Sequence, residues 1–190
     1  MPKLFAFLRA INVGGHVVKM DQLRELFVDL GLTNVETFIA SGNVIFESRS
    51  KNPNALQRKI EDYLAKSVGY EVATFVRTLE ELERINEYRP FSEAELNAQG
   101  NTLYVGFIAD IPGKAAAQQV EALATDVDYL KVNGREVYWL CCTSFSDTKI
   151  SGALLEKTLG MKVTLRNINT IRRLVKKYSL RSLVFNSKRL

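Results

Sequence analysis

The stretch Tyr129-Leu130-Lys131-Val132-Asn133-Gly134-Arg135-Glu136-Val137-Tyr138-Trp139-Leu140 decides the fold of the second half of this sequence. Two strand-like runs, 129–132 and 136–142, flank Asn133-Gly134, and this dipeptide between alternating hydrophobic residues is a strong signal of a β-hairpin. Hydrophobic spacing and helix-end signals predict a strand and a helix before the hairpin, and a helix, a strand and a helix after it. These further elements are expected at residues 102–109, 112–124, 150–159, 163–166 and 170–178.

The first half repeats this order of elements, β-α-β-β-α-β-α. Thr78 and Glu81 have the spacing of a capping box at the start of a short helix. In each half a strand ends in an arginine, Arg77 or Arg166, and a helix begins shortly afterwards. A polar linker is expected over 91–100. The expected elements of the first half are residues 3–9, 20–30, 35–40, 44–47, 52–68, 71–77 and 78–85.

The repeated order predicts an α+β fold made of two ferredoxin-like halves of the βαββαβ type, with helices packed on antiparallel sheets. The expected domains are residues 3–90 and 101–178, followed by a C-terminal extension over 179–190. The halves could be separate or intertwined. The first residues enter a strand without a charged leader, and no apolar run is long enough to cross a bilayer. We therefore expect a cytoplasmic protein.

The composition disfavours several classes of protein. One histidine, His16, and two adjacent cysteines, Cys141 and Cys142, cannot form a tetrahedral zinc site of usual spacing. No P-loop is present, and Gly14-Gly15 lacks the full dinucleotide-binding fingerprint. We expect no metal and no cofactor, which disfavours metal hydrolases, P-loop NTPases and Rossmann dehydrogenases.

The charge is distributed unevenly along the chain, whose net charge is +5. Residues 149–190 hold 11 Lys or Arg against one acid, Glu156, which gives +10. The preceding 148 residues hold 15 basic and 20 acidic residues, which gives −5. This asymmetry indicates an acidic partner or an anionic ligand near the C-terminal segment. The alternative is a solvated basic surface that balances the acidic remainder of the chain.

Three polar loops could bind such an anion: residues 9–15, residues 41–43 and residues 166–170. They supply guanidinium, amide, hydroxyl and backbone N–H donors but no carboxylate, which suits a phosphate, a carboxylate or a nucleic-acid backbone. A cap at Asn169 or Thr170 would aim the free N–H groups of the last helix at the same anion. The candidate anion-binding residues are Arg9, Asn12, Gly14, Gly15, Ser41, Asn43, Lys149, Arg166, Asn167, Asn169 and Thr170.

The loops also carry a resemblance to a known family. The stretches Leu8-Arg9-Ala10-Ile11-Asn12-Val13-Gly14-Gly15, Phe38-Ile39-Ala40-Ser41-Gly42-Asn43-Val44 and Arg166-Asn167-Ile168-Asn169-Thr170 resemble the bacterial domain-of-unknown-function family numbered 1697. The resemblance extends from Lys3 to about Tyr178, and Lys149 matches a lysine of the family pattern. It implies an α+β fold with duplicated ferredoxin-like parts and no established activity. The family usually has Gly at Ala10 and an aromatic residue at Ile168, so a ring that stacks on a ligand there is not expected.

Each loop also has a purely structural interpretation. Gly14-Gly15 and Ser41-Gly42-Asn43 suit tight turns, while Arg166 and the amides after it suit a helix cap. Arg9 could pair with a surface acid. Tyr138 and Trp139 alternate on a strand, so one of them is expected in the core.

Three functions are compatible with these observations. The leading hypothesis is a module that binds nucleic acid or a phosphorylated small molecule without catalysis. An alternative is a metal-independent enzyme that holds a small anionic substrate with Arg9, Lys149 and Arg166. Another is an interaction module that forms a homodimer through residues 179–190. The last helix is expected to pack an apolar stripe (Ile171, Leu174, Val175 and Tyr178) on the sheet and to turn its basic residues toward water.

Overall fold

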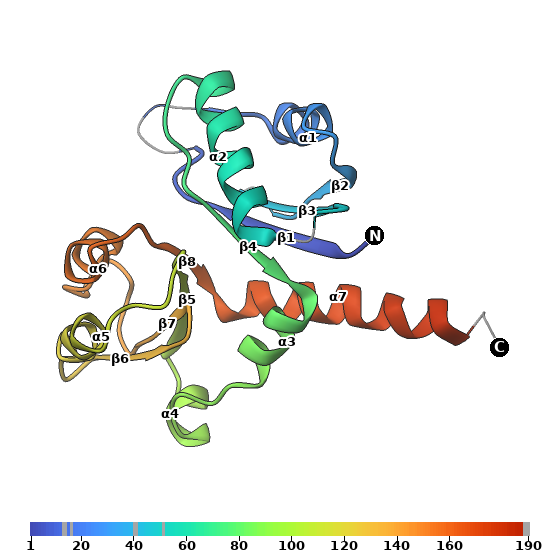
Figure 1. Ribbon diagram of the computed structural model, residues 1–190. Coiled ribbons are helices and arrows are strands. Elements are labelled where there is room, and N and C mark those ends of the chain that lie inside the picture. Colours follow the sequence, from blue (N-terminus) through green and yellow to red (C-terminus); the bar gives the residue numbers. More distant parts are fainter. Residues whose placement is uncertain (13–14, 16, 40–41, 51, 188–190) are drawn as a thin grey trace. The chain divides into compact units, whose positions relative to one another are not determined.

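The computed structural model describes residues 1–12, 15, 17–39, 42–50 and 52–187, with residues 180–187 described by their backbone only (Figure 1). The chain divides into two compact units, Met1–Glu81 and Leu82–Leu190, and each is described here by itself. The candidate residues Gly14 and Ser41, and also His16, lie outside the described residues.

Both units have the same succession of strands and helices. The first contains β1 (Lys3–Leu8), α1 (Met20–Asp29), β2 (Thr33–Thr37), β3 (Asn43–Glu47), α2 (Pro53–Val68) and β4 (Thr74–Thr78). The helix α3 (Leu79–Glu87) follows β4 directly and leads into the second unit. The second unit contains α4 (Glu93–Asn97), β5 (Thr102–Phe107), α5 (Lys114–Glu121), β6 (Asp128–Asn133), β7 (Glu136–Cys141), α6 (Gly152–Leu159), β8 (Thr164–Asn167) and α7 (Ile168–Ser187).

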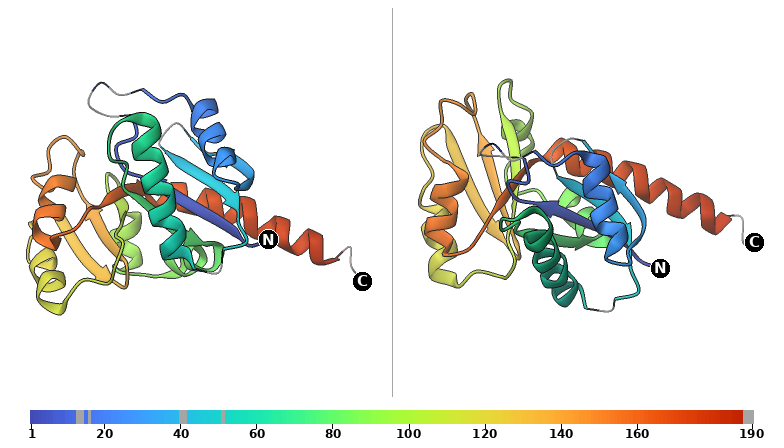
Figure 2. Two further views of the ribbon diagram at one scale, coloured as in Figure 1. Left: turned by 45° about the horizontal axis from the view of Figure 1, so that its top comes forward. Right: turned by 90° about the horizontal axis from the view of Figure 1, so that it is seen from above.

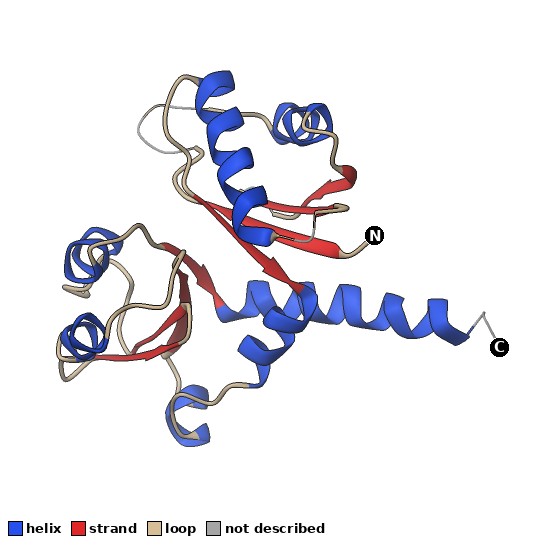
Figure 3. Cartoon of the chain, in the orientation of Figure 1, coloured by secondary structure: helices blue, strands red, loops and turns tan. Residues whose placement is uncertain are grey.

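Each unit forms one four-stranded antiparallel sheet (Figure 3). The strand orders are β2-β3-β1-β4 and β6-β7-β5-β8, so equivalent strands occupy equivalent places. In each sheet the first strand lies between the third and the fourth strands, which is the arrangement expected from a βαββαβ succession. The prediction of an α+β fold with two similar halves is therefore confirmed.

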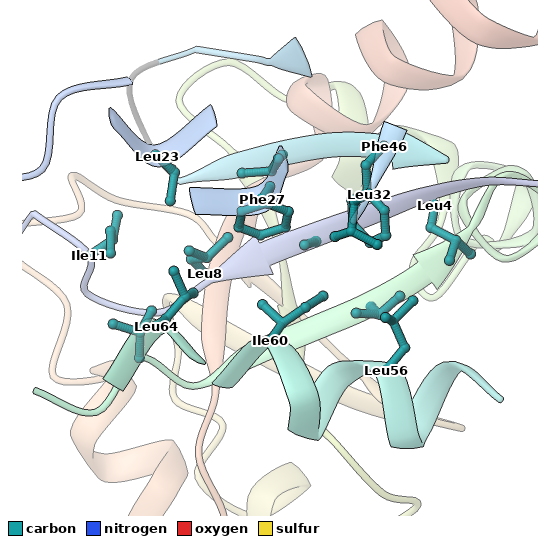
Figure 4. Packing of buried hydrophobic residues seen from close by; sticks show 14 of the residues in the cluster. Leu4, Leu8, Ile11, Leu23, Phe27, Leu32, Phe46, Leu56, Ile60 and Leu64 are labelled. Carbon is teal, nitrogen blue, oxygen red and sulfur yellow. The ribbon is translucent and has the colours of Figure 1, made fainter. Parts of the chain in front are cut away.

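The core of the first unit lies between its sheet and the helices α1 and α2 (Figure 4). Helical spacing places Leu23 and Phe27 of α1 on one face, and both are fully buried. The ring of Phe27 lies 5.5 Å from that of Phe46 on β3. On α2 the buried face consists of Leu56, Gln57, Ile60 and Leu64.

The core of the second unit is built in the same way from α5, α6 and one face of the second sheet. These two helices lie side by side on that face in the views of Figure 1 and Figure 2. Val120 of α5 and Leu155 of α6 are fully buried against Trp139 of β7 and its neighbours. One of Tyr138 and Trp139 was expected in the core, and both are buried, with 1% of Tyr138 and 0% of Trp139 exposed.

Side chains from helices and turns accept hydrogen bonds from backbone N–H groups of two outer strands, β4 and β6. Unpaired N–H groups on an edge strand invite pairing with another chain, and occupied ones do not. On β6, Val132 N–H donates to Glu121 Oε1 at 3.0 Å. On β4 the donor and acceptor pairs are Thr74 N to Glu61 Oε1 (2.8 Å), Val76 N to Gln57 Oε1 (3.2 Å) and Thr78 N to Glu81 Oε2 (2.7 Å).

The last of these bonds belongs to the capping box predicted at Thr78 and Glu81, which is confirmed because Glu81 N–H also donates to Thr78 Oγ1 at 3.2 Å. Two other expectations for helices need correction. The expected linker 91–100 contains α4, which begins with a capping box between Ser92 and Glu95. The last helix starts at Ile168 and continues through Ser187, because no glycine or proline follows Tyr178 to end it.

Candidate functional site

The loop that follows β1 is held at one end of the first sheet by contacts with two other segments. Leu8 N–H donates to Gly42 O at 2.8 Å, and Arg9 N–H donates to Ala73 O at 2.8 Å. The Tyr70 hydroxyl donates to Ile11 O at 2.7 Å. The described parts of two of the predicted polar loops, after β1 and before β3, therefore lie next to each other.

The backbone around this junction is strained. Ala10 and Ile39 have φ values of 55° and 58°, in the left-handed region that β-carbon-bearing residues rarely adopt. Gly42, at φ 67°, approaches the β1 loop so closely that an added Cβ would lie 2.9 Å from Ile11 Cγ2. Strain of this kind persists only where the surrounding structure imposes it. Ala10 lies next to Ile11, which Gly42 approaches, so we expect this close contact to help hold the strained backbone.

The amides predicted to bind an anion in the first unit are used to close these loops. Asn12 Oδ1 accepts a hydrogen bond from Val18 N–H at 2.7 Å. Asn43 is buried, and its Nδ2 donates to Phe38 O at 2.9 Å. Gly15 is exposed at φ 88°, which suits the turn that was its structural interpretation. Arg9 is half-buried.

In the second unit, Arg166 lies on β8 with 9% of its surface exposed. Its Nη1 donates to Thr164 Oγ1 at 2.9 Å and to Leu165 O at 2.8 Å. Burial lowers the pKa of Arg166 to about 10, so the side chain keeps its charge at neutral pH. Part of its donor capacity is therefore directed to its own strand.

Arg77 occupies the equivalent place in the first unit. Arg77 is opposite Phe5 of β1, as Arg166 is opposite Val105 of β5. Arg77 is fully buried, and its Nη1 donates to Val76 O at 3.0 Å. The internal likeness of the two units thus includes a buried arginine that bonds the carbonyl group of the residue before it.

The remaining candidates of the second unit lie at the start of α7 and before α6. Asn167 Oδ1 accepts from Asn169 N–H at 2.8 Å, and Asn169 Oδ1 accepts from Arg172 Nη1 at 3.2 Å. Thr170 is half-buried. Lys149 is exposed and makes no hydrogen bond or ion pair with any residue that the structure describes. Arg9 and Asn12 belong to the first unit and these residues to the second. A single recess that brings all of them together therefore stays a prediction.

A buried polar cluster in the second unit was missed from the sequence. Asp128 is fully buried, and its Oδ1 accepts from Trp139 Nε1–H at 2.7 Å. Its Oδ2 accepts from the Thr148 hydroxyl at 2.6 Å. The ring of Phe145, which is 52% exposed, lies 5.4 Å from that of Trp139. The cluster fixes the segment between β7 and α6, and a carboxylate that is hydrogen-bonded in this way has no sequence signal of its own.

Cys141 and Cys142 are both free. Burial raises the pKa of each thiol, so both are poor nucleophiles at neutral pH. Across the described part of the chain, no group of three or more His, Cys, Asp or Glu side chains is placed to hold a metal ion. No helix among the described residues is long and apolar enough to cross a membrane.

The structure is an α+β protein of two similar units, and we compared its chain with known protein families. The chain belongs to the family described as "Protein of unknown function (DUF1697)", which matches residues 1–138. The resemblance stated from the sequence motifs is therefore confirmed as to the family. The third motif, residues 166–170, lies beyond the matched residues.

Among solved structures, the chain is similar to the conserved bacterial protein SP0830 from Streptococcus pneumoniae. The two are 25% identical with a TM-score of 0.72, and the similarity covers 94% of this chain and 99% of the other. None of the curated proteins matches the chain.

Proposed function

We propose that this protein binds nucleic acid without catalysis, through the exposed basic face of α7. The observation that carries the proposal is the exposure of Arg172, Arg173 and Lys176 on a helix whose sequence contains no acidic residue. This segment also lies within the part of the chain that carries a charge of +10. A surface of this kind attracts the phosphate groups of a nucleic-acid backbone.

The two sides of α7 have different roles. Ile171, Leu174 and Tyr178 are buried, so the apolar stripe packs against the protein. Arg172 and Lys176 are one helical turn apart on the other side, where side chains at such spacing lie about 6 Å from each other. Among the described residues, Arg172 donates a hydrogen bond only to the neutral side chain of Asn169, and Lys176 makes no hydrogen bond or ion pair.

Recognition of this kind depends on charge rather than on base sequence. Sheets that read RNA bases do so by stacking them on exposed strand aromatics. Tyr138 and Trp139 are both buried, so these rings of β7 offer no such platform. Arg and Lys side chains supply positive charge and hydrogen-bond donors to phosphate oxygens. Binding should therefore be sensitive to salt and tolerant of sequence.

We also propose that the protein is cytoplasmic and that each half has a ferredoxin-like fold. Homodimerisation through residues 179–190 is a second proposal for the same segment, in which α7 continues to Ser187. A phosphorylated small molecule is the competing ligand. A few fixed donors would hold such a molecule, so it would not need contacts spread along α7.

The test is fluorescence anisotropy with labelled single-stranded RNA between about 50 and 300 mM salt. Three phosphate contacts predict a slope of log affinity against log salt of about −2. The triple variant Arg172→Ala, Arg173→Ala, Lys176→Ala should lose most of the affinity and most of this slope. The control, Lys19→Ala, Arg58→Ala, Lys66→Ala, removes the same charge from exposed positions of the first unit and should retain both. No binding at about 50 mM salt, or equal losses in the two triple variants, would reject the proposal.

A further inference from the structure

A pocket of about 600 Å³ opens in the first unit, at the opposite end of the sheet from the Arg9 loop. Its location follows from the register, because Lys3 at the start of β1 is opposite Glu47, which is in turn opposite Thr33. The pocket lies where α1 ends, β2 begins, β3 ends and α2 begins. The Arg9 loop leaves the other end of β1.

The apolar part of the pocket is the exposed margin of the first core. Leu32 and Leu56 line it, and both belong to the buried cluster, where they are 5% and 6% exposed (Figure 4). Leu30 and Met1 add further apolar surface. In Figure 4, Leu56 and Leu4 lie at one end of this cluster, and Ile11 lies at the other. A ligand in the pocket would therefore rest an apolar group on Leu32 and Leu56.

The polar part of the pocket is basic. Arg49 and Lys59 line it, and none of the described lining residues is acidic. Arg49 is exposed and makes no hydrogen bond or ion pair with a described residue. Lys59 Nζ donates to Leu30 O at 3.3 Å, which uses one of the three donors of its ammonium group. Among the described residues, therefore, nothing competes with an incoming anion for the guanidinium of Arg49.

Hydroxyl groups and a helix end reinforce this preference. Ser48 is buried, and its Oγ accepts from Ser50 N–H at 3.1 Å, so its own O–H can still donate. The helix α2 begins at Pro53, has no acidic residue in its first turn, and contributes Ala55 to the pocket. The positive end of the α2 dipole therefore adds to the field of Arg49.

We infer that this pocket binds a small amphipathic anion, with a carboxylate or phosphate head on Arg49 and an aliphatic body on Leu32 and Leu56. A guanidinium binds both head groups through paired hydrogen bonds. A volume of about 600 Å³ is in the range of small-molecule sites, and a few polar groups beside an apolar floor are typical of them. The site lies in the first unit and does not depend on the proposed role of α7.

The test uses four probes on the full chain labelled with ¹⁵N: octanoate, octyl phosphate, octanol and inorganic phosphate. Titrations are followed by amide shifts, with Gly31, Ser48 and Ser50 as reporters in the pocket. Octanoate, octyl phosphate or both should bind in the low millimolar range and move these signals. Octanol lacks the charge and inorganic phosphate lacks the body, so each should bind at least about tenfold more weakly. The comparison of the first two probes identifies the head group.

Two variants locate the contact. Arg49→Gln should weaken binding of the anionic probes about tenfold, since a hydrogen bond to a charged group is lost. Arg58→Gln is the matched control, because Arg58 is an exposed cation of α2 that does not line the pocket. Ala55→Trp places a large ring in the pocket from an exposed helix position and should abolish binding.

Three results would overturn the inference. The first is that neither octanoate nor octyl phosphate shifts the amide signals of the pocket reporters, even at about 10-fold the concentration expected to half-saturate the site. The second is equal binding of octanol or inorganic phosphate and the amphipathic anions. The third is an equal loss in Arg49→Gln and Arg58→Gln. RNA binding by α7 is measured separately, so either proposal can fail without the other.

Discussion

The substitution Gly42→Ala tests the close contact on which the loop junction of the first unit depends. An added methyl group would lie 2.9 Å from Ile11 Cγ2 and 3.2 Å from Leu8 Cβ. Both neighbours are buried, with 3% and 1% of their surfaces exposed, so neither can move aside freely. Gly42 also accepts the Leu8 N–H at 2.8 Å, which fixes its distance from β1.

Two costs contribute to the expected effect. A β-carbon at φ 67° costs about 1–2 kcal/mol, and overfilling a packed site typically costs about 1–3 kcal/mol more. Gly42→Ala should therefore lower the free energy of unfolding by about 2–5 kcal/mol. Gly69→Ala separates the two costs, since Gly69 has a φ of 84° with nothing within 4 Å of its added Cβ. It should lose only about 1–2 kcal/mol.

The measurement is urea unfolding of the wild type and both variants, followed by far-UV circular dichroism at one pH. The difference between the two variants isolates the contact with Ile11 and Leu8. If Gly42→Ala is within about 0.5 kcal/mol of Gly69→Ala, the junction is not tightly packed. The expectation that this contact helps hold the strained backbone at Ala10 would then be wrong.

Two further predictions concern carboxylates that accept hydrogen bonds in the fold, one buried and one half-buried. Asp128→Ala should lower the free energy of unfolding by about 3 kcal/mol, because Trp139 Nε1–H and the Thr148 hydroxyl lose their acceptor. Fluorescence of Trp139, the single tryptophan, reports the unfolding transition. A loss under about 1 kcal/mol contradicts the prediction. Burial raises the pKa of Glu61 above its usual value, so the folded state binds the proton more tightly and stability rises as the pH falls through that raised pKa toward the usual one. Glu61→Gln keeps an acceptor for Thr74 N–H, so its stability relative to the wild type should decline in thermal melts from pH 7 to pH 4, and a relative gain would contradict the cause assigned to the shift.

The succession of elements could be predicted from the sequence because it depends on local signals. The Asn133-Gly134 turn, the spacing of Leu23 and Phe27, and the Thr78–Glu81 capping box each involve residues close in the chain. Helix ends were harder to place. The last helix was expected to stop near Tyr178, yet the sequence has no glycine or proline there and α7 continues to Ser187.

The candidate site was less predictable, since it depends on contacts between distant segments. The proximity of Gly42 to Ile11 follows from the pairing of β3 with β1, which no local pattern encodes. The pocket at Arg49 and Lys59 likewise forms where α1 and α2 meet the ends of β2 and β3. The two cations are ten residues apart, without a motif that would single them out.

Residue type alone could not show which hydrogen-bonding atoms of the polar loops the fold already uses. Asn12, Asn43 and Asn167 were chosen because amides can hold an anion, and binding by them stays a prediction. The Oδ1 atoms of Asn12 and Asn167 accept bonds that close a turn or cap a helix, whereas Asn43 donates through Nδ2 to Phe38 O. A hydrogen-bonding atom that completes the fold can be redirected to a ligand only at the cost of the bond it leaves. Arg49 and Lys176 make no hydrogen bond or ion pair with a described residue, and thus meet no such cost.

This difference explains why both proposals rest on exposed cations rather than on the loop motifs that resemble the family. The motif residues Leu8, Ile11 and Gly42 form a strained junction, and the strain is balanced by packing inside the first unit. Their role in the described structure is to set the path of the chain. Both proposals therefore assign binding to exposed cations, and Arg49 and Lys176 can each be replaced without disturbing that path.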